Sequence, residues 1–283
     1  MAEFLCELAA ASEKPRSHIK VAVAALSNMY KAMNMDIITD DPDIRTLITG
    51  LVKGGTREPM ARTSAMPVER FVELFSGWPG NNDLDVSRLR LKAVTLLALT
   101  LCLRPSDIAP KSVSYDPLTG TSTKNIFTRD MITVLSDSAQ ITLFGIKNDL
   151  QRQGFQLKLP RHPVQKLCQV AALESYMDHT KSFCSEDNGV FLTLLPPYSA
   201  ISARRIGKIM DEAIKLAGLP AHYTPKYFRP TGATQAIESG QDPEVVRKIG
   251  RWKSSHVFYE HYVHSRTPTD YVTGILPVSV DDH

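Results

Sequence analysis

The chain has 283 residues, of which 43% are hydrophobic and 22% are charged, so it can bury a large core and is not a disordered chain. Its net charge of +3 identifies no partner. Its four cysteines form no CxxC pair, which argues against a zinc site and a disulfide framework and is typical of an intracellular, non-secreted protein. No segment is apolar over about 18 residues and the N-terminus lacks a signal peptide's basic region, so no membrane association is expected.

The first third of the chain is predicted to be helical. Apolar residues recur at helical spacing from Ser17 to Met35, and Asp41-Pro42 begins another helix that stops at Gly54-Gly55. A stretch without apolar periodicity follows. We therefore expect a small helical domain over residues 1–55, a linker over 56–66 and a second domain over 67–283. A helix begins almost at once at Phe4-Leu5, so the first domain is expected to be incomplete at its N-terminus.

The second domain is predicted to be mainly helical with a small inserted antiparallel sheet, an α+β arrangement. A long apolar helix is expected over 85–102. Three short runs rich in β-branched and aromatic residues then predict strands, at 126–135, 140–146 and 154–159. Helices return at 164–183, at 199–216 and after Pro225, and Asp242-Pro243-Glu244 predicts one more helix that ends at Gly250.

Arg104 follows the long apolar helix. Pro105 disfavours helical dihedrals at the residue before it, so Arg104 is expected at a helix junction. A short helix beginning at Pro105 would bring Asp107 within reach of Arg104. An arginine held in this way can contact two oxygens of one phosphate. Taken alone, a locally paired capping arginine is the simpler interpretation.

Three further basic residues stand in constrained segments. Lys147 is expected at the tip of a hairpin, just after the second strand. Lys226 and Arg229 are three residues apart in a segment bounded by Pro225 and Pro230, and Pro230 is expected to interrupt the helix at Arg229. Two cations placed so close together favour an anion between them, although a random pair of this kind is more often a screened surface feature.

Three aromatic residues stand near the end of the chain. Trp252 comes directly after Gly250-Arg251. Tyr259 and Tyr262 are three residues apart in a short helix predicted over 255–263. An indole can donate one hydrogen bond. A tyrosine is a weak nucleophile unless nearby cations lower its pKa or a base takes its proton. Each of these residues alone is more simply explained by core packing.

The segment 201–266 is the most basic part of the chain. It holds eleven Lys and Arg against six Asp and Glu, an excess of +5 that is suited to phosphate contacts.

Together these residues resemble the tyrosine recombinases, also called phage-integrase-like proteins. The resemblance extends over about 67–266 and rests on LCLRPSD, LFGIKND, TPKYFRPTGAT, GRWKSS and YEHYVH. FRPTGAT and GRWKSS are most similar to the eukaryotic mobile-element branch, the DIRS- and Crypton-type recombinases. The matching positions are Arg104, Lys147, Lys226, Arg229, Trp252 and Tyr262, and helices within 1–55 would form the core-binding domain that clamps DNA.

The resemblance implies DNA cleavage through a 3′-phosphotyrosyl link at Tyr262, with recombination or integration as the outcome. Arg104 and Arg229 would balance the phosphate charge, Asp107 would hold Arg104, and Lys147 would protonate the leaving 5′ oxygen. Lys226 and Trp252 would hydrogen-bond the phosphate. The family needs no cofactor or metal, acts on double-stranded DNA and assembles there into dimers and then tetramers. It is nuclear when it comes from a eukaryotic mobile element and cytoplasmic otherwise.

Two departures from the family pattern keep alternatives open. The second box begins with a lysine where histidine is commoner, and Tyr262 lies ten residues past Trp252 where nine is usual, so Tyr259 remains the alternative nucleophile. A type IB topoisomerase, an inactive domesticated DNA-binding protein and a helical scaffold are the other candidates. The apolar tail over 270–280 is expected to dock on a neighbouring protomer.

Overall fold

The computed structural model describes residues 2–11, 15–35, 38–53, 65–109, 114–116, 121–123, 127–143, 155–183 and 189–262. The chain divides into two compact units, Met1–Arg62 and Thr63–His283. None of the helices in the described ranges combines the length and the apolar character needed to cross a membrane.

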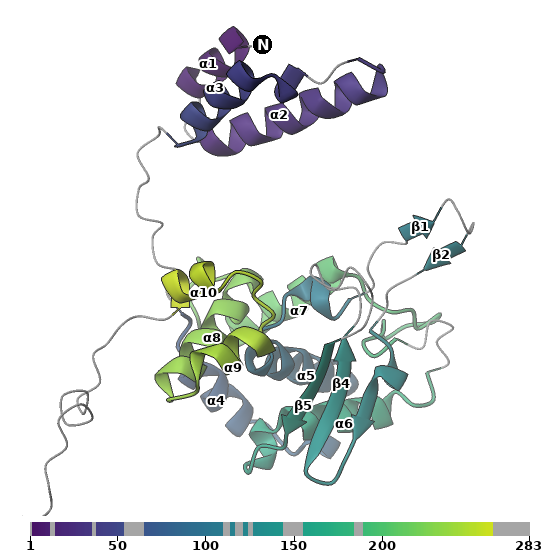
Figure 1. Ribbon diagram of the computed structural model, residues 1–283. Coiled ribbons are helices and arrows are strands. Elements are labelled where there is room, and N and C mark those ends of the chain that lie inside the picture. Colours follow the sequence, from purple (N-terminus) through teal and green to yellow (C-terminus); the bar gives the residue numbers. More distant parts are fainter. Residues whose placement is uncertain are drawn as a thin grey trace, which may run out of the picture. The chain divides into compact units, whose positions relative to one another are not determined.

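The first unit consists of three helices that pack on one another, α1 (Ala2–Ala11), α2 (Pro15–Ala32) and α3 (Pro42–Lys53), with a short 3-10 turn at Ile38–Asp40 (Figure 1). Its buried apolar side chains include Leu5 and Ile19. The start of α3 is the one that the sequence predicts: the Asp41 carboxylate accepts the backbone N–H groups of Asp43 and Ile44 at 2.8 and 3.2 Å.

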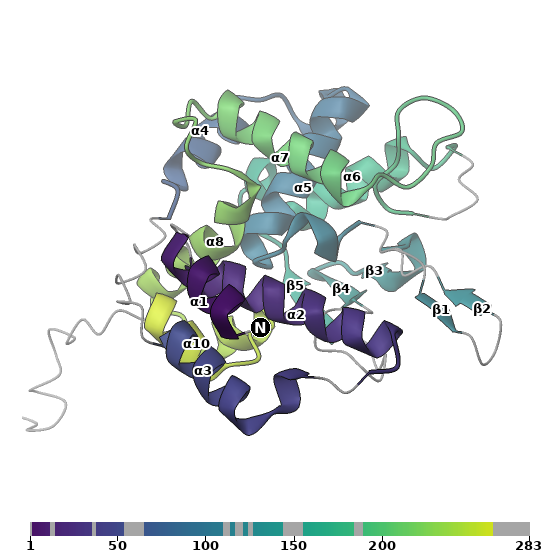
Figure 2. The same ribbon diagram turned by 90° about the horizontal axis from the view of Figure 1, so that it is seen from above.

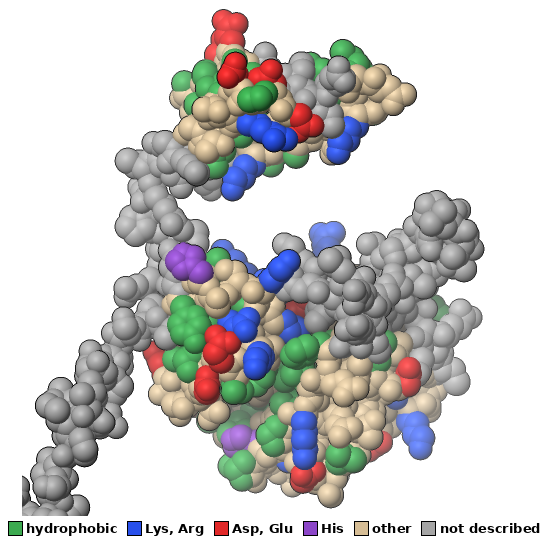
Figure 3. All heavy atoms as spheres, viewed as in Figure 1, with side chains coloured by type: hydrophobic (Ala, Val, Ile, Leu, Met, Phe, Trp, Pro, Cys, Tyr) green, Lys and Arg blue, Asp and Glu red, His purple; other side chains and the backbone are tan. Residues whose placement is uncertain are grey.

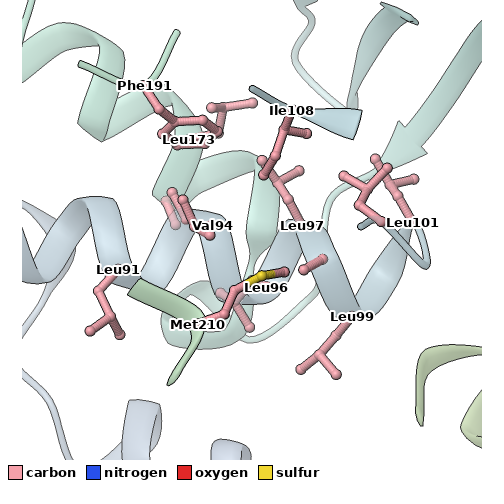
Figure 4. Packing of buried hydrophobic residues seen from close by; sticks show 14 of the residues in the cluster. Leu91, Val94, Leu96, Leu97, Leu99, Leu101, Ile108, Leu173, Phe191 and Met210 are labelled. Carbon is pink, nitrogen blue, oxygen red and sulfur yellow. The ribbon is translucent and has the colours of Figure 1, made fainter. Parts of the chain in front are cut away.

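The second unit is built around α5 (Val86–Thr100), which Asp85 caps at its N-terminus. Every residue of α5 from Leu89 to Leu99 is buried, as expected for a helix covered on all sides. It packs against α6 (Gln169–His179), α7 (Ala203–Leu216) and α8 (Phe228–Glu238). Figure 4 shows its apolar side chains interleaved with Leu173 of α6 and Met210 of α7. Figure 2 shows α7 crossing close to α5.

A three-stranded antiparallel sheet covers another part of this core. Its order is β3 (Ile132–Val134), β4 (Ser138–Leu143) and β5 (Phe155–Pro160). Ile141 of β4 lies opposite Ile132 on one side and Leu157 on the other. These side chains belong to the same buried cluster as α5 and α6, so one face of the sheet points inward.

Smaller elements complete the unit. They are α4 (Glu69–Ser76), α9 (Pro243–Ile249), α10 (Ser255–Tyr262), 3-10 turns at Asn81–Asp83, Pro105–Asp107, Arg129–Met131, Gln165–Leu167 and Pro225–Tyr227, and the strands β1 (Ser114–Asp116) and β2 (Thr121–Thr123), which pair antiparallel. The β1–β2 pair is not among the elements predicted from the sequence. Asp242 caps α9 and Gly250 ends it, as the sequence predicts.

Two local predictions are wrong. The expected strand over 126–135 is a strand only from Ile132, because a 3-10 turn takes its middle. There the Arg129 guanidinium donates to the carbonyl of Met177 at 2.9 Å and to the hydroxyl of Thr180 at 2.6 Å, which ties the turn to the end of α6. The second error is at Pro230, which does not interrupt α8. It lies in the first turn, where its missing N–H would have no helical acceptor in any case.

Candidate active site

Arg104 lies between α5 and a 3-10 turn, Pro105–Asp107. The backbone leaves α5 through Cys102, whose φ is +50°. Arg104 itself is extended, with φ −90° and ψ 158°, as the following proline requires. The Asp107 carboxylate accepts the backbone N–H of Arg104 at 2.8 Å. The Arg104 side chain is exposed, so its charge stands at the surface of the unit.

Asp107 makes its ion pair with Arg251, which the sequence analysis gave no role. The Arg251 guanidinium lies 3.1 Å from the Asp107 carboxylate, and the two side chains are only 6% and 9% exposed. Asp107 was expected to hold Arg104, and the contact that the structure shows is with the Arg104 backbone N–H. The reason lies in the turn after α9, where Arg251 adopts φ +59° and directs its side chain back to the 3-10 turn. Asp107 therefore joins the Arg104 turn to the turn before Trp252.

Arg229 is the most buried of the predicted site residues that the structure describes. It is 6% exposed and lies in the first turn of α8, where its Nη1 donates to the carbonyl of Cys102 at 2.9 Å. Burial lowers the pKa of Arg229 to about 10, and the charges of Arg104 and Arg251 contribute to the shift. The residue is still protonated at neutral pH. Its Nε is buried and has no hydrogen-bond partner within the described part of the chain.

A glycine allows Arg229 to approach the end of α5. A Cβ added at Gly232 would overlap the carbonyl oxygen of Leu99 and lie 3.2 Å from the Cys102 sulfur. Because no side chain separates the helices here, α8 packs directly on the last turn of α5. The close approach places Arg229 against the Cys102 carbonyl, two residues before Arg104.

Trp252 covers the other side of Arg229. The Arg229 guanidinium carbon lies 3.8 Å from the centroid of the indole ring, a cation–π distance. The ring also lies directly on Gly250, where an added Cβ would overlap it. The backbone of this turn is held twice: Trp252 donates its N–H to the Arg247 carbonyl at 3.1 Å, and the Arg247 guanidinium donates to the Trp252 carbonyl at 2.8 Å.

Tyr262 is the last residue of α10 and packs against Trp252, with 5.0 Å between the ring centroids. Burial raises the pKa of the Tyr262 phenol above its ordinary value. The charges of Arg229 and Arg104 and a hydrogen bond with Trp252 act in the opposite direction but are smaller effects. The two arginines thus favour the phenolate, but burial of the ring outweighs them and the net shift is upward. The resting phenol is neutral.

Tyr259 has different neighbours. Its side chain is 38% exposed and faces the start of α9. Partial desolvation raises the pKa of the Tyr259 phenol, and a hydrogen bond and the charge of Glu244 raise it further. Of the two tyrosines, Tyr262 is therefore the one whose hydroxyl is influenced by Arg104 and Arg229. We call Arg104, Arg229, Trp252 and Tyr262 the arginine–tyrosine cluster.

Of the two predicted lysines, the structure describes only Lys226, which is not part of this cluster. Lys226 is exposed in the 3-10 turn Pro225–Tyr227, with its ammonium 5.3 Å from the ring centroid of Tyr227. No described contact links it to the cluster. Lys147 lies outside the described residues. Among the residues that the structure does describe, no group of three or more His, Cys, Asp and Glu side chains is placed to hold a metal ion.

Part of the chain matches a known protein family. Residues 152–268 match the phage integrase family. This range contains Arg229, Trp252 and Tyr262 but begins after Arg104. No curated protein sequence matches the chain significantly.

Solved structures match over most of the chain. The XerH site-specific recombinase bound to palindromic difH substrate, in a post-cleavage complex, aligns with a TM-score of 0.57 at 12% identity, over 96% of this chain and 72% of that one. The Tn1549 transposon integrase in complex with circular intermediate DNA aligns with a TM-score of 0.52 at 13% identity, over 98% and 83%. The chain therefore has the tyrosine recombinase catalytic fold, and its residues 152–268 match the phage integrase family.

Proposed function

We propose that this protein cuts and rejoins duplex DNA through a 3′-phosphotyrosyl intermediate, and that it carries out site-specific recombination or the integration of a mobile element. The fold supports this proposal, as do structural neighbours that are recombinases and integrases in complex with DNA. The arginine–tyrosine cluster supplies the chemistry that such a reaction needs.

The observation that carries the proposal is the state of Arg229. Its guanidinium is buried, stacked on Trp252 and affected by the charges of Arg104 and Arg251. Like charges brought together in a desolvated place destabilise one another, and an anion bound between them removes that penalty. A DNA phosphate that binds beside the exposed Arg104 would supply that anion.

In the proposed reaction, the residues of the cluster act as follows. The Tyr262 oxygen attacks the phosphorus and bonds to it, while the bond from phosphorus to the 5′ oxygen breaks. Arg104 and Arg229 balance the charge that grows on the non-bridging oxygens, usually the largest single term in such catalysis. Since the resting phenol is neutral, its proton passes to water as the attack proceeds. Attack by the 5′ hydroxyl of a second strand then releases Tyr262, so the strands are exchanged without hydrolysis.

Other parts of the proposal rest on the family resemblance. Lys147 protonates the leaving 5′ oxygen and Lys226 contacts the phosphate. The three-helix unit grips DNA as a core-binding domain, and protomers assemble on DNA into dimers and tetramers. The DIRS- or Crypton-type branch, and with it action in the nucleus, is the finer assignment that FRPTGAT and GRWKSS support. Figure 3 shows Lys and Arg side chains over the region of α8, α9 and α10, with acidic side chains among them.

A nicked half-site substrate tests the proposal, because loss of the short fragment beyond the cleavage point traps the covalent complex. We expect the wild-type protein to form an adduct that survives denaturation and is removed by protease. Tyr262→Phe keeps the ring and loses only the phenolic oxygen, so it should bind DNA without forming the adduct. Tyr259→Phe is the matched control and should form it. An adduct that persists in Tyr262→Phe would reassign the nucleophile. If the wild-type protein binds DNA without forming an adduct, it is a DNA-binding descendant of the family. If it neither binds DNA nor forms an adduct, it has no nucleic-acid role.

A further inference from the structure

A single carboxylate oxygen joins the two turns that carry Arg104 and Trp252. The Asp107 Oδ2 atom accepts the backbone N–H of Arg104 at 2.8 Å and a guanidinium N–H of Arg251 at 3.1 Å. Asp107 also donates its own N–H to the Arg104 carbonyl at 2.9 Å. The backbone of Arg104 is therefore bound on both sides by Asp107, and Asp107 is bound by Arg251.

The contact between Arg251 and Asp107 is shielded from water. The two side chains are 6% and 9% exposed, which makes this the most buried ion pair among the described residues. Solvent and salt screen such a pair much less than a surface pair. Its geometry is also well defined, because both partners belong to short turns that follow helices, α5 and α9. The pair is therefore able to fix one turn relative to the other.

Arg251 reaches Asp107 from an unusual backbone conformation. Its φ is +59°, in the left-handed region that is unfavourable for a residue with a Cβ. Such conformations persist where the surroundings impose them, and they gather at functional sites. The next residue, Trp252, stacks on the Arg229 guanidinium at 3.8 Å. The ion pair therefore connects the turn of Arg104 to the residue that covers Arg229.

This connection bears on the two arginines of the proposed reaction. The Arg104 side chain is exposed, so its position depends on how its backbone is held. We propose that Arg251 is a positioning residue for strand cleavage, which through Asp107 holds the turn of Arg104 where Arg104 and Arg229 contact the same phosphate. The inference rests on the proposed function and gives Arg251 no contact with DNA. A misplacement of about 1 Å can reduce a rate about 10²-fold.

The paired substitution Asp107→Asn/Arg251→Met separates positioning from stability. It removes one charge of each sign, so the net charge is unchanged and no buried charge is left without a partner. The asparagine oxygen can still accept the Arg104 N–H, and only the link to the turn of Trp252 is lost. On the nicked half-site we expect an unchanged Kd and a rate of adduct formation at saturating DNA that is about 10- to 10²-fold lower.

Rates are compared at a temperature below the Tm of every variant. Arg70→Met is the matched control, because it removes an exposed ion pair with Glu73 from α4 and should cleave like the wild type. A paired variant that cleaves at the wild-type rate would overturn the proposal and leave the ion pair a purely structural role. A higher Kd with an unchanged rate at saturating DNA would overturn it as well, because positioning acts on the reaction and not on binding.

The Arg104→Ala background tests whether Arg251 acts through Arg104. A half-site with sulfur in place of the bridging 5′ oxygen keeps slow variants measurable, because a thiolate leaves more readily. An absent side chain cannot be misplaced, so the paired substitution should change the rate of Arg104→Ala by less than about twofold. An equal loss in both backgrounds would overturn the proposal. A wild-type protein that forms no adduct overturns the proposed function itself, whereas the other contrary outcomes remove only the role of Arg251.

Discussion

Removing Arg251 should destabilise the second unit far more than an ordinary ion pair would suggest. Arg251→Ala leaves the Asp107 carboxylate buried at 9% side-chain exposure without the guanidinium 3.1 Å away. Breaking one side of a buried pair costs roughly 3–5 kcal/mol. Because Asp107 still accepts the Arg104 N–H, we expect the lower end, about 3 kcal/mol. At roughly 2–4 °C per kcal/mol for a unit of this size, Tm should fall by about 6–12 °C.

Tryptophan fluorescence during urea unfolding measures this loss without interference from the first unit, because both tryptophans, Trp78 and Trp252, belong to the second unit. Arg70→Ala is the matched control: its partner is Glu73, both side chains are more than half exposed, and the loss should be within about 1 kcal/mol. Adding Asp107→Asn to Arg251→Ala should recover more than half of the lost stability. If Arg251→Ala costs no more than Arg70→Ala, Asp107 does not depend on this pair.

Three other expectations concern the site, the basic segment and the core. Arg229→Ala should reduce adduct formation on the order of 10²–10³-fold, and Arg229→Lys should rescue poorly because lysine lacks the forked donor geometry; a parental cleavage rate would contradict this, provided that Tm is unchanged. DNA affinity should fall by about 0.9 log units per log unit of salt for each neutralised phosphate, and a flat titration would exclude a phosphate-gripping surface. Burial lowers the pKa of Lys92 to about 8 from 10.5, so between these pH values the unfolded chain binds more protons than the folded one and stability should rise with pH. The increase of the free energy of unfolding with pH should be smaller in Lys92→Met. An identical pH slope in the two proteins would contradict a lowered Lys92 pKa in the folded state.

The elements that local sequence controls were predictable. Asp41, Asp85 and Asp242 begin helices because a carboxylate next to the first turn satisfies free N–H groups. The run from Ala93 to Leu103 is apolar except for two threonines, which predicts a buried helix. The turn at Arg129–Met131 was not predictable, because what holds it is a pair of acceptors about 50 residues away at the end of α6.

The candidate site also has features that the sequence predicted and features that it did not. The family pattern indicated Arg104, Arg229, Trp252 and Tyr262, and the structure brings them together across a sequence separation that spacing alone could not bridge. The pairing of Arg251 with Asp107 escaped notice, since it depends on a residue with positive φ after Gly250. The direction of the Tyr262 pKa shift also depends on burial, which no local motif encodes. Lys147 and the tail at 270–280 lie outside the described residues, so the roles expected of them stay predictions.

The hydrogen bond from Arg229 to the Cys102 carbonyl has a practical consequence. The thiol of the same residue is 2% exposed, and burial raises its pKa to about 11, so at pH 8 only about one molecule in a thousand carries the reactive thiolate. Alkylation of Cys102 therefore requires a local opening that separates α8 from the end of α5. The alkylation rate of Cys102 therefore measures how often α8 separates from the end of α5. The measurement uses a native residue and needs no added label.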